Sequence, residues 1–369
     1  MIYFDHNATT PIDDRVLEAM LPFLKTFYGN PSSLYRQGRI VRSAMDSARE
    51  QVAALVGVQP TQVIFTSGGT EANNLALTAI KPQAALAVST IEHPSVSEPA
   101  ENLSHQGHDL KLIAVDHNGL VTQQALDKII KFKPTLVSIM LANNETGVIQ
   151  NVANYAHQLR DKGILVHTDA VQALGKIPID FNQLGVNMMS LSSHKIYGSK
   201  GCGALIFDKD VSLKPMLLGG GQQQGFRAGT ENVPAIIGFG KAAELARLEL
   251  AQRAEHSLKL RTLLEDHLAT IPGIFIFAKN AERLPNTVQF GIEGMDGEML
   301  LMKLDQKGVA VSSGSACASG GGKPSPVLAA MGVTPELAKS AIRVSFGKDN
   351  TKAEINQFIE LLKNLINPD

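Results

Sequence analysis

The sequence predicts an α/β protein in which helices cover both faces of a mainly parallel sheet. Between residues 12 and 240, helical patterns alternate with short apolar runs, as expected of βαβ units. These runs are nearly continuous, which is typical of strands buried on both faces. The 369-residue chain also exceeds the roughly 250–300 residues at which one hydrophobic core stops growing, so we expect two domains.

Residues 12–240 supply the sheet and two of its covering helices. Residues 13–26 and 39–56 repeat apolar side chains with the 3.6-residue period of a helix that packs on a sheet. Seven strands are expected from the apolar runs that follow. They are Val63–Thr66, Ala85–Ser89, Leu112–Val115, Leu136–Leu141, Ile164–His167, Met188–Leu191 and Ala204–Phe207.

The pattern changes after a long charged helix rich in alanine and leucine, expected near residues 240–270. Strands are then expected near 272–278, 286–292 and 309–312, with helices near 297–306 and 352–366. We therefore expect a large domain over 12–250 and a smaller α+β domain built from 1–11 and 251–369. Two glycine-rich stretches, 219–229 and 312–326, are candidate mobile loops.

Composition excludes several classes of function. The net charge is −1 with no long block of one sign, so we expect neither a nucleic-acid partner nor an anionic membrane surface. No run approaches the ~20 apolar residues of a membrane span, and the N-terminus does not resemble a signal peptide. A cytoplasmic enzyme is the expectation. The two cysteines make no disulfide framework and fit no metal-site spacing, and Cys202 is expected to be structural, at the start of a buried strand.

Two polar side chains are expected at the carboxyl edge of the sheet, where open α/β sheets bind ligands. Lys195 follows one buried strand, and Asp169 ends another. A lysine that forms a Schiff base and an acid that faces a pyridinium nitrogen are the pair that pyridoxal phosphate requires. The alternatives are a surface lysine and an aspartate that caps the next helix.

A phosphate site is expected where Val63–Thr66 leads through Ser67-Gly68-Gly69 into a helix. Free backbone N–H groups and the helix dipole favour an anion there. Any tight strand-to-helix turn has a similar sequence, but the motifs of the competing nucleotide-binding loops do not occur.

Cys317 lies among serines, glycines and alanines in residues 311–322. A thiol that must reach a substrate and then leave with its sulfur needs an exposed, mobile loop. The alternative is an idle surface thiol, and composition alone favours neither.

Together these residues resemble the cysteine desulfurase family, enzymes of the aspartate-aminotransferase fold type. The similar motifs run in order over nearly the whole chain. They include Phe4–Pro11, Tyr28–Ser33, Thr66–Glu71, Glu92-His93, Asn143–Gly147, His167–Gln172, Ser192–Lys195, Arg227–Thr230, Ser312–Cys317 and Ile342–Ser345.

The resemblance implies a role for each matching residue. Lys195 would hold pyridoxal 5′-phosphate and then move the substrate α-proton, while Asp169 would pair with the pyridine nitrogen. Gln172 would bond the phenolic oxygen, and His93 would stack on the ring and is a candidate to handle protons. Arg343 would clamp the substrate carboxylate, unless it forms only a surface salt bridge. The phosphate ligands would be Gly69, Thr70, Ser192, His194 and, across a dimer interface, Thr230, and Asn144 would contact cofactor or substrate.

The expected reaction removes sulfur from L-cysteine, leaving L-alanine and a persulfide on Cys317. The resemblance implies a homodimer and a sulfur-acceptor protein, such as an iron–sulfur scaffold or a tRNA-thiolation partner. The loop after Cys317 has the length of the long-loop group that serves iron–sulfur assembly, although it is unusually rich in glycine. The chain has fewer residues after Arg343 than the family members whose C-terminal tails help to dock a scaffold protein. The resemblance therefore does not identify the sulfur acceptor.

Two other functions are compatible with parts of this pattern. A selenocysteine lyase or a class V aminotransferase would have the same fold, but an aminotransferase has no use for Cys317. A non-catalytic sulfur carrier would have no use for Lys195, Asp169, His93 and Arg343.

Overall fold

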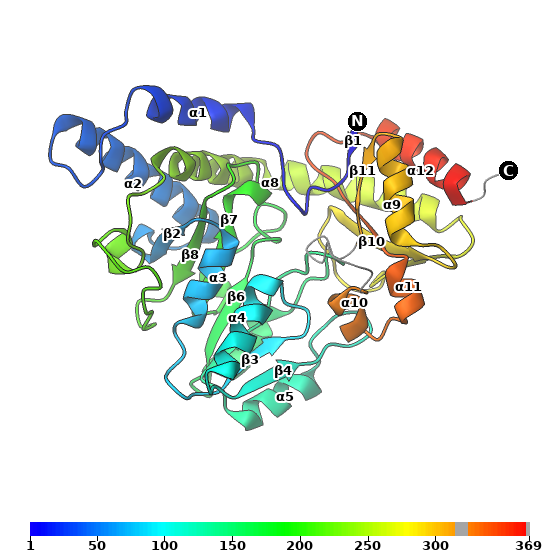
Figure 1. The fold of residues 1–369 in the computed structure, drawn as a ribbon, viewed down its shortest axis with the longest axis horizontal. Coiled ribbons are helices and arrows are strands. Elements are labelled where there is room, and N and C mark those ends of the chain that lie inside the picture. Colours follow the sequence, from blue (N-terminus) through cyan, green and yellow to red (C-terminus); the bar gives the residue numbers. More distant parts are fainter. Residues whose placement is uncertain (314–323, 367–369) are drawn as a thin grey trace.

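The computed structural model describes residues 1–313 and 324–366, and it confirms the predicted α/β fold (Figure 1). All seven strands expected between residues 12 and 240 belong to one seven-stranded sheet. They are β2 (Val63–Thr66), β3 (Leu86–Ser89), β4 (Leu110–Ile113), β5 (Leu136–Ser138), β6 (Leu165–Asp169), β7 (Met188–Ser192) and β8 (Gly203–Phe207).

The strands lie in the order β2-β8-β7-β6-β5-β3-β4. Only β8 runs against its neighbours, because it is antiparallel to both β2 and β7. The strands from β7 to β4 pair in parallel. The carboxyl ends of β2, β3, β5, β6 and β7 therefore all lie at one edge of the sheet, where a ligand site is expected.

Both faces of this sheet are buried, as the continuous apolar runs predict. Along β2, Val63 and Phe65 belong to one hydrophobic core, and Ile64 belongs to another on the opposite face. The helices of the first core are α1 (Asp14–Lys25), α2 (Arg36–Val56), α5 (Gln123–Phe132), α6 (Val152–Arg160), α7 (Phe181–Leu184) and the start of α8 (Val233–Leu268). The opposite face is covered by α3 (Gly69–Leu77) and α4 (Pro94–His105).

Helix α8 is the expected long helix, although it begins at Val233 rather than near residue 240. Asn232 caps it through a hydrogen bond from the Ala235 N–H. Phe239 packs in the core under the large sheet, and Leu264 packs in a separate core farther along the helix. Figure 1 shows α8 running from one group of elements to the other.

The second core surrounds a four-stranded antiparallel sheet of order β12-β13-β10-β9. Its strands are β9 (Ile274–Ile276), β10 (Thr287–Ile292), β12 (Ser312–Ser313) and β13 (Ile342–Ser345). Beside it, β1 (Ile2–Tyr3) pairs in parallel with β11 (Val309–Ala310). The helices of this part are α9 (Gly297–Gln306), α10 (Pro326–Ala330), α11 (Pro335–Lys339) and α12 (Lys352–Ile366).

Several short elements of this second part were not predicted. The strand expected near 309–312 is two strands, β11 and β12, in different sheets. Strand β1 has two residues, Arg343 interrupts the apolar residues of β13, and α10 and α11 have five residues each, too few to show a helical period. The division into two domains stays a prediction, because α8 is continuous across residue 250.

The structure describes the first candidate mobile loop in full and the second only in part. Residues 219–229 contain a single 3₁₀ turn, η3 (Gln223–Gly225), and are otherwise irregular. The stretch 312–326 begins in β12 and leads into α10, and its residues 314–323 lie outside the described part of the chain. Within the described residues, no helix combines the length and the apolar character that a membrane crossing requires.

Candidate active site

The carboxyl edge of the large sheet brings together side chains from four strands. Lys195 lies in η2 (Ser193–Lys195), directly after β7, and Asp169 is the last residue of β6. His93 follows β3 as the N-cap of α4, and Asn144 follows β5. Lys195 is half-buried, so it is not the exposed surface lysine of the alternative interpretation.

The turn between β2 and α3 has the features of an anion cradle. The first backbone N–H groups of a helix have no partner inside the helix, and the helix dipole favours negative charge beside them. A Cβ on Gly69 would lie 2.9 Å from Val171 Cγ2 and 3.7 Å from Ser192 Cβ, which places Ser192 beside this helix start. Ser192 Oγ is buried and has no hydrogen-bond partner among the described residues. Such a buried donor fits an oxygen-rich ligand.

His194 lies in η2 beside the N-terminal segment of the chain. Its Nδ1 is 3.1 Å from Thr9 Oγ1. Burial lowers the pKa of His194 to about 4, and the nearby charges of Lys195 and Lys200 add to this shift. A neutral His194 would approach a phosphate as a hydrogen-bond donor and not as a counter-charge.

Asp169 is held by two donors. Its Oδ1 accepts a bond from the Val171 N–H at 2.9 Å, and its Oδ2 accepts one from Asn73 Nδ2 at 2.7 Å. The Val171 bond caps the turn after β6, so the capping interpretation of Asp169 holds for a turn and not for a helix. Asn73, on α3, also donates to Ser95 Oγ at 2.8 Å. The sequence interpretation missed Asn73, although it lies two residues beyond the Thr66–Glu71 motif.

The same network continues to His93. Ser95 Oγ lies 2.7 Å from His93 Nδ1, and the Ser95 N–H donates to that nitrogen at 3.1 Å. Because Nδ1 accepts a bond, a neutral His93 carries its proton on Nε2. Burial lowers the pKa of His93, while the charge of Asp169 opposes that shift. His93 is therefore a ring with a fixed tautomer, tied through Ser95 and Asn73 to Asp169.

Glu92 is a buried acid directly before His93. Its Oε1 accepts bonds from Ser89 Oγ at 2.6 Å and from the Met140 N–H at 2.7 Å. Its Oε2 has no hydrogen-bond partner among the described residues. Burial raises the pKa of Glu92 to about 8, and the charge of Asp169 contributes to the increase. Glu92 is therefore protonated at neutral pH.

The N-terminal segment closes one side of the site. Lys195 Nζ donates to the backbone carbonyls of Asn7 at 2.5 Å and Ala8 at 2.7 Å. Gln172 Nε2 donates to the same Asn7 carbonyl at 2.9 Å. Asn7 has no role in the sequence interpretation, and only its place in the Phe4–Pro11 motif could have singled it out.

Arg343 lies in β13 and is buried, so the salt bridge that it forms with Asp5 is not the surface salt bridge of the alternative interpretation. Its Nη2 donates to Asp5 Oδ1 at 2.6 Å, and its Nη1 donates to the Asn144 carbonyl at 2.9 Å. Its Nε is buried without a hydrogen-bond partner among the described residues. These contacts place Arg343 next to Asn144, with capacity left for an anion.

Glu145 accepts hydrogen bonds from a residue of the small sheet and from the residue that caps α10. Its Oε2 accepts bonds from Ser325 Oγ at 2.5 Å and from Gln289 Nε2 at 3.3 Å. Gln289 is the register partner of Arg343 in the small sheet, and Ser325 caps α10. Burial raises the pKa of Glu145 to about 7, while Ser325 and the charge of Arg343 oppose the increase.

Thr230 is exposed and lies just before α8, so the described chain does not bring it into its own site. The segment that carries it is nevertheless tied to the phosphate cradle. Arg227 Nε donates to Glu71 Oε1 at 2.9 Å, and Glu71 is in the first turn of α3. A role for Thr230 in a second copy of the chain stays a prediction.

The structure describes one of the two cysteines. Cys202 is buried directly before β8, and burial raises the pKa of its thiol to about 12. It is the structural cysteine that the sequence predicts. Cys317 lies outside the described residues. In the described part of the chain, no three His, Cys, Asp or Glu side chains are grouped so that they could hold a metal ion.

These observations fit pyridoxal phosphate. The turn before α3 and the Ser192 hydroxyl, which has no partner among the described residues, suit its phosphate. Asp169 suits a pyridinium nitrogen, and Lys195 is the amine that would bind its aldehyde. The fit depends on side chains from β2, β6 and β7 that the sheet order brings to one edge.

Known proteins are similar to this chain over nearly its whole length. The family model described as aminotransferase class-V matches residues 2–358. A cysteine desulfurase IscS of Dictyoglomus turgidum is 41% identical over 375 residues, covering 99% of this chain and 94% of that protein. A cysteine desulfurase IscS of Methanosarcina thermophila is 40% identical over 370 residues, covering 99% and 92%.

Solved structures show the same similarity. A structure described as a NifS-like protein has a TM-score of 0.93 and 39% identity, covering 99% of both chains. A NifS-like protein from Rickettsia africae ESF-5 has a TM-score of 0.91 and 36% identity, also covering 99% of both. A structure described as SspA in complex with cysteine has a TM-score of 0.84 and 29% identity, covering 95% of this chain and 100% of that one.

Proposed function

This chain belongs to the aminotransferase class-V family, and we propose that it is a cysteine desulfurase that converts L-cysteine into L-alanine and a persulfide on Cys317. The observation that carries the proposal is the meeting of Lys195, Asp169 and an anion cradle at one sheet edge, in a chain similar to named cysteine desulfurases.

Pyridoxal 5′-phosphate is the proposed cofactor. Lys195 would bind it covalently, Asp169 would face its ring nitrogen, Gln172 its phenolic oxygen and His93 its ring. The phosphate would be held by Gly69, Thr70, Ser192, His194 and the partner copy's Thr230. The bound cofactor withdraws electrons from the substrate α-carbon.

Arg343 is the proposed site for the substrate carboxylate. Its Nε is buried and unpaired among the described residues, and its two terminal nitrogens are already oriented by Asp5 and the Asn144 carbonyl. A guanidinium whose orientation is set before binding loses little entropy when a carboxylate arrives. Asn144 would contact the substrate or the cofactor beside it.

Lys195 is the proposed carrier of the substrate α-proton. In this structure its amine faces the carbonyls of Asn7 and Ala8. Both are acceptors without protons, so they orient the lysine amine and leave proton transfer to Lys195 itself.

Cys317 is the proposed acceptor of the sulfur. Its thiolate would form a bond to the substrate sulfur while the carbon–sulfur bond of cysteine breaks, and the carbon would then take a proton to give alanine. His93 Nδ1 accepts from the Ser95 N–H, so taking the Cys317 proton there would require that bond to break. The fixed tautomer favours His93 Nε2–H as a donor instead.

We further propose a cytoplasmic homodimer that passes its persulfide sulfur to an acceptor protein, with an iron–sulfur scaffold as the leading candidate. Thr230 is exposed in the single chain, and Arg227, on the same segment, bonds Glu71 beside the phosphate cradle. Both observations support a role for Thr230 in the site of a partner copy.

The test is production of alanine and sulfide from L-cysteine in the presence of a reductant. We expect wild type to form them in equal amounts, and Cys317→Ala to bind the cofactor but lose catalytic sulfur release. Brisk multiple turnover by Cys317→Ala would contradict the role of Cys317. Cofactor absorbance without any alanine would contradict the proposed substrate.

A further inference from the structure

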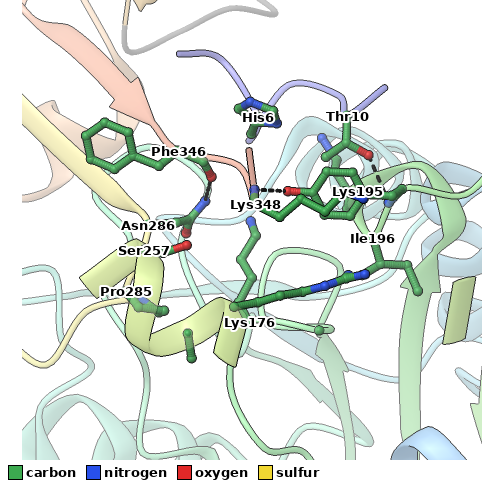
Figure 2. Close-up of a pocket in the computed structure, with 14 residues that line it drawn as sticks. His6, Thr10, Lys176, Lys195, Ile196, Ser257, Pro285, Asn286, Phe346 and Lys348 are labelled. Atoms are coloured by element: carbon green, nitrogen blue, oxygen red, sulfur yellow. Dashed lines mark hydrogen bonds between the residues drawn. The ribbon is translucent and has the colours of Figure 1, made fainter. Parts of the chain in front are cut away.

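Lys176 lies behind the proposed site and has no role in the function proposed above. It is four residues after Gln172, in the turns that follow β6. Its Nζ donates to Gln172 Oε1 and to Asn7 Oδ1, both at 2.9 Å. Lys176 and Lys195 also line the same small cavity of about 30 Å³, on which Figure 2 shows both side chains.

The bond from Lys176 determines which way round the Gln172 amide lies. An amide has one accepting and one donating end, and its orientation follows from its partners. Gln172 Oε1 faces the Lys176 amine, and Gln172 Nε2 faces the Asn7 carbonyl at 2.9 Å. The reverse orientation would put an amide oxygen against a carbonyl oxygen and remove the acceptor from Lys176.

This orientation turns the Gln172 donor toward Lys195. The Asn7 carbonyl accepts from Gln172 Nε2 and also from Lys195 Nζ, so the two nitrogens share one acceptor. An amide nitrogen has two hydrogens, and only one is needed for Asn7. The other is left for a group bound at Lys195.

Lys176 holds the Asn7 side chain in the same way. Asn7 Oδ1 accepts from Lys176 Nζ and from Asn286 Nδ2 at 3.0 Å, while its Nδ2 donates to Thr287 Oγ1 at 2.9 Å. One amine therefore orients the amide of Gln172 and anchors the residue whose carbonyl contacts Lys195.

We propose that Lys176 is a positioning residue that keeps the Gln172 donor aimed at the Lys195 side of the site. The inference rests on the proposed function, because Gln172 is assigned there to the phenolic oxygen of the cofactor. A donor to that oxygen stabilises its deprotonated form and strengthens cofactor binding.

The number of donors on Lys176 matches this role. Burial lowers the pKa of the Lys176 amine well below its ordinary value, and the charges of Lys195 and Arg343 lower it further. Asn7 Oδ1 and Gln172 Oε1 need one N–H donor each, and the Lys176 amine supplies two whether or not it carries a charge. The role therefore needs no buried positive charge.

The test compares Lys176→Met, Gln172→Ala and the double variant with wild type. Two properties are measured: the dissociation constant of the apoprotein for pyridoxal phosphate, and the midpoint of the pH titration of the bound cofactor's visible absorbance. Lys348→Met is the matched control, because Lys348 lines the same cavity but donates to Asp13 Oδ2 at 2.6 Å. Urea unfolding of each apoprotein measures any general loss of stability.

We expect Lys176→Met and Gln172→Ala each to weaken cofactor binding about 10-fold, as the loss of one hydrogen bond predicts, and to move the midpoint to higher pH. The double variant should be within about twofold of Gln172→Ala, because the effect of Lys176 on the cofactor passes through Gln172, while the loss of its bond to Asn7 is measured by urea unfolding. Lys348→Met should bind and titrate as wild type.

Three results would overturn the inference. Lys176→Met could bind and titrate as wild type while Gln172→Ala does not, or the two effects could add in the double variant. Gln172→Ala could also leave both properties unchanged, which would remove the group through which Lys176 acts. Failure of the proposed function is a separate result, because it appears as absent alanine formation by wild type with cofactor bound.

A shorter donor covers the case in which Lys176→Met does not fold. Lys176→Gln keeps an amide N–H₂ group one bond closer to the backbone, too short to hold both acceptors at 2.9 Å. We expect a smaller shift of both properties in the same direction. Wild-type binding and titration by Lys176→Gln would count against the inference.

Discussion

At the scale of single residues, the site is organised by side chains that do not carry the chemistry. Asn73 donates to both Asp169 and Ser95, and Ser95 in turn bonds His93. The acid proposed for the pyridine nitrogen and the ring proposed to stack on the cofactor therefore belong to one hydrogen-bonded network. Such a network sets tautomers and rotamers before any ligand arrives.

Glu92, directly before His93, gives the stability of the protein a dependence on pH. Its pKa is raised from 4.5 to about 8 in the folded protein, chiefly by burial and then by the charge of Asp169. The folded state therefore binds more protons than the unfolded state between these values. The free energy of unfolding should fall as pH rises from 4.5 to about 8, by at most about 1.4 kcal/mol per pH unit.

Glu92→Gln should remove this contribution, because its amide does not titrate but keeps an oxygen for Ser89 and Met140. Urea unfolding of both proteins at several pH values between 5 and 8 measures the difference. The stability of wild type relative to Glu92→Gln should decline with pH. Glu101→Gln, at an exposed glutamate on α4, is the control. Parallel stability profiles for wild type and Glu92→Gln would contradict the assignment.

At the scale of elements, the start of α3 depends on the absence of one side chain. Gly69 packs so closely against Val171 that a Cβ would lie 2.9 Å from Val171 Cγ2. Val171 follows Asp169 at the end of β6, and its N–H is bonded to the Asp169 carboxylate. The position of the phosphate cradle and the position of the Asp169 carboxylate therefore both depend on Val171.

Gly69→Ala should displace the helix start and weaken the binding of pyridoxal phosphate to the apoprotein by about 10-fold, the equivalent of about 1.4 kcal/mol. Titration of the apoprotein with the cofactor measures the change. The double variant Gly69→Ala/Val171→Ala removes the clashing methyl group and should recover most of the affinity. An equal loss in the single and double variants would show that the contact is not the cause.

At the scale of the whole molecule, the N-terminal segment joins the two cores. The buried Asn7 side chain bonds Lys176 beside the large sheet and Asn286 and Thr287 beside the small one. Its backbone N–H bonds Ser345 Oγ on β13 at 2.9 Å. The amine of Lys195 is oriented by this same residue, so the site and the junction of the two sheets share one anchor.

Asn7→Ala should lower the free energy of unfolding by about 2–4 kcal/mol, because it leaves several buried polar groups without partners. Urea denaturation measures the loss. Asn154→Ala is the control, because Asn154 is exposed on α6, and it should change stability by less than about 0.5 kcal/mol. Equal stability of the two variants would mean that the junction does not depend on Asn7.

The predictable part of the fold and site follows from local sequence. All seven strands of the large sheet were expected because each is an apolar run long enough to recognise, although β4 begins two residues before its predicted start. Lys195 and Asp169 could be placed because each follows or ends such a run. Strand β13 was not predicted because Arg343 interrupts its apolar residues, so the buried position of Arg343 was also not predictable.

The sequence by itself determined the fold class, the edge of the sheet at which the site lies, and the residue types present there. These depend on hydrophobic periodicity and on motifs of a few neighbouring residues. Only the tertiary structure decided that Asn73 holds Asp169, that Lys176 orients Gln172, and that Asn7 connects Lys195 to the small sheet. The physical reason is that these bonds join residues far apart in the chain or depend on amide orientation, and both are set by packing rather than by local pattern.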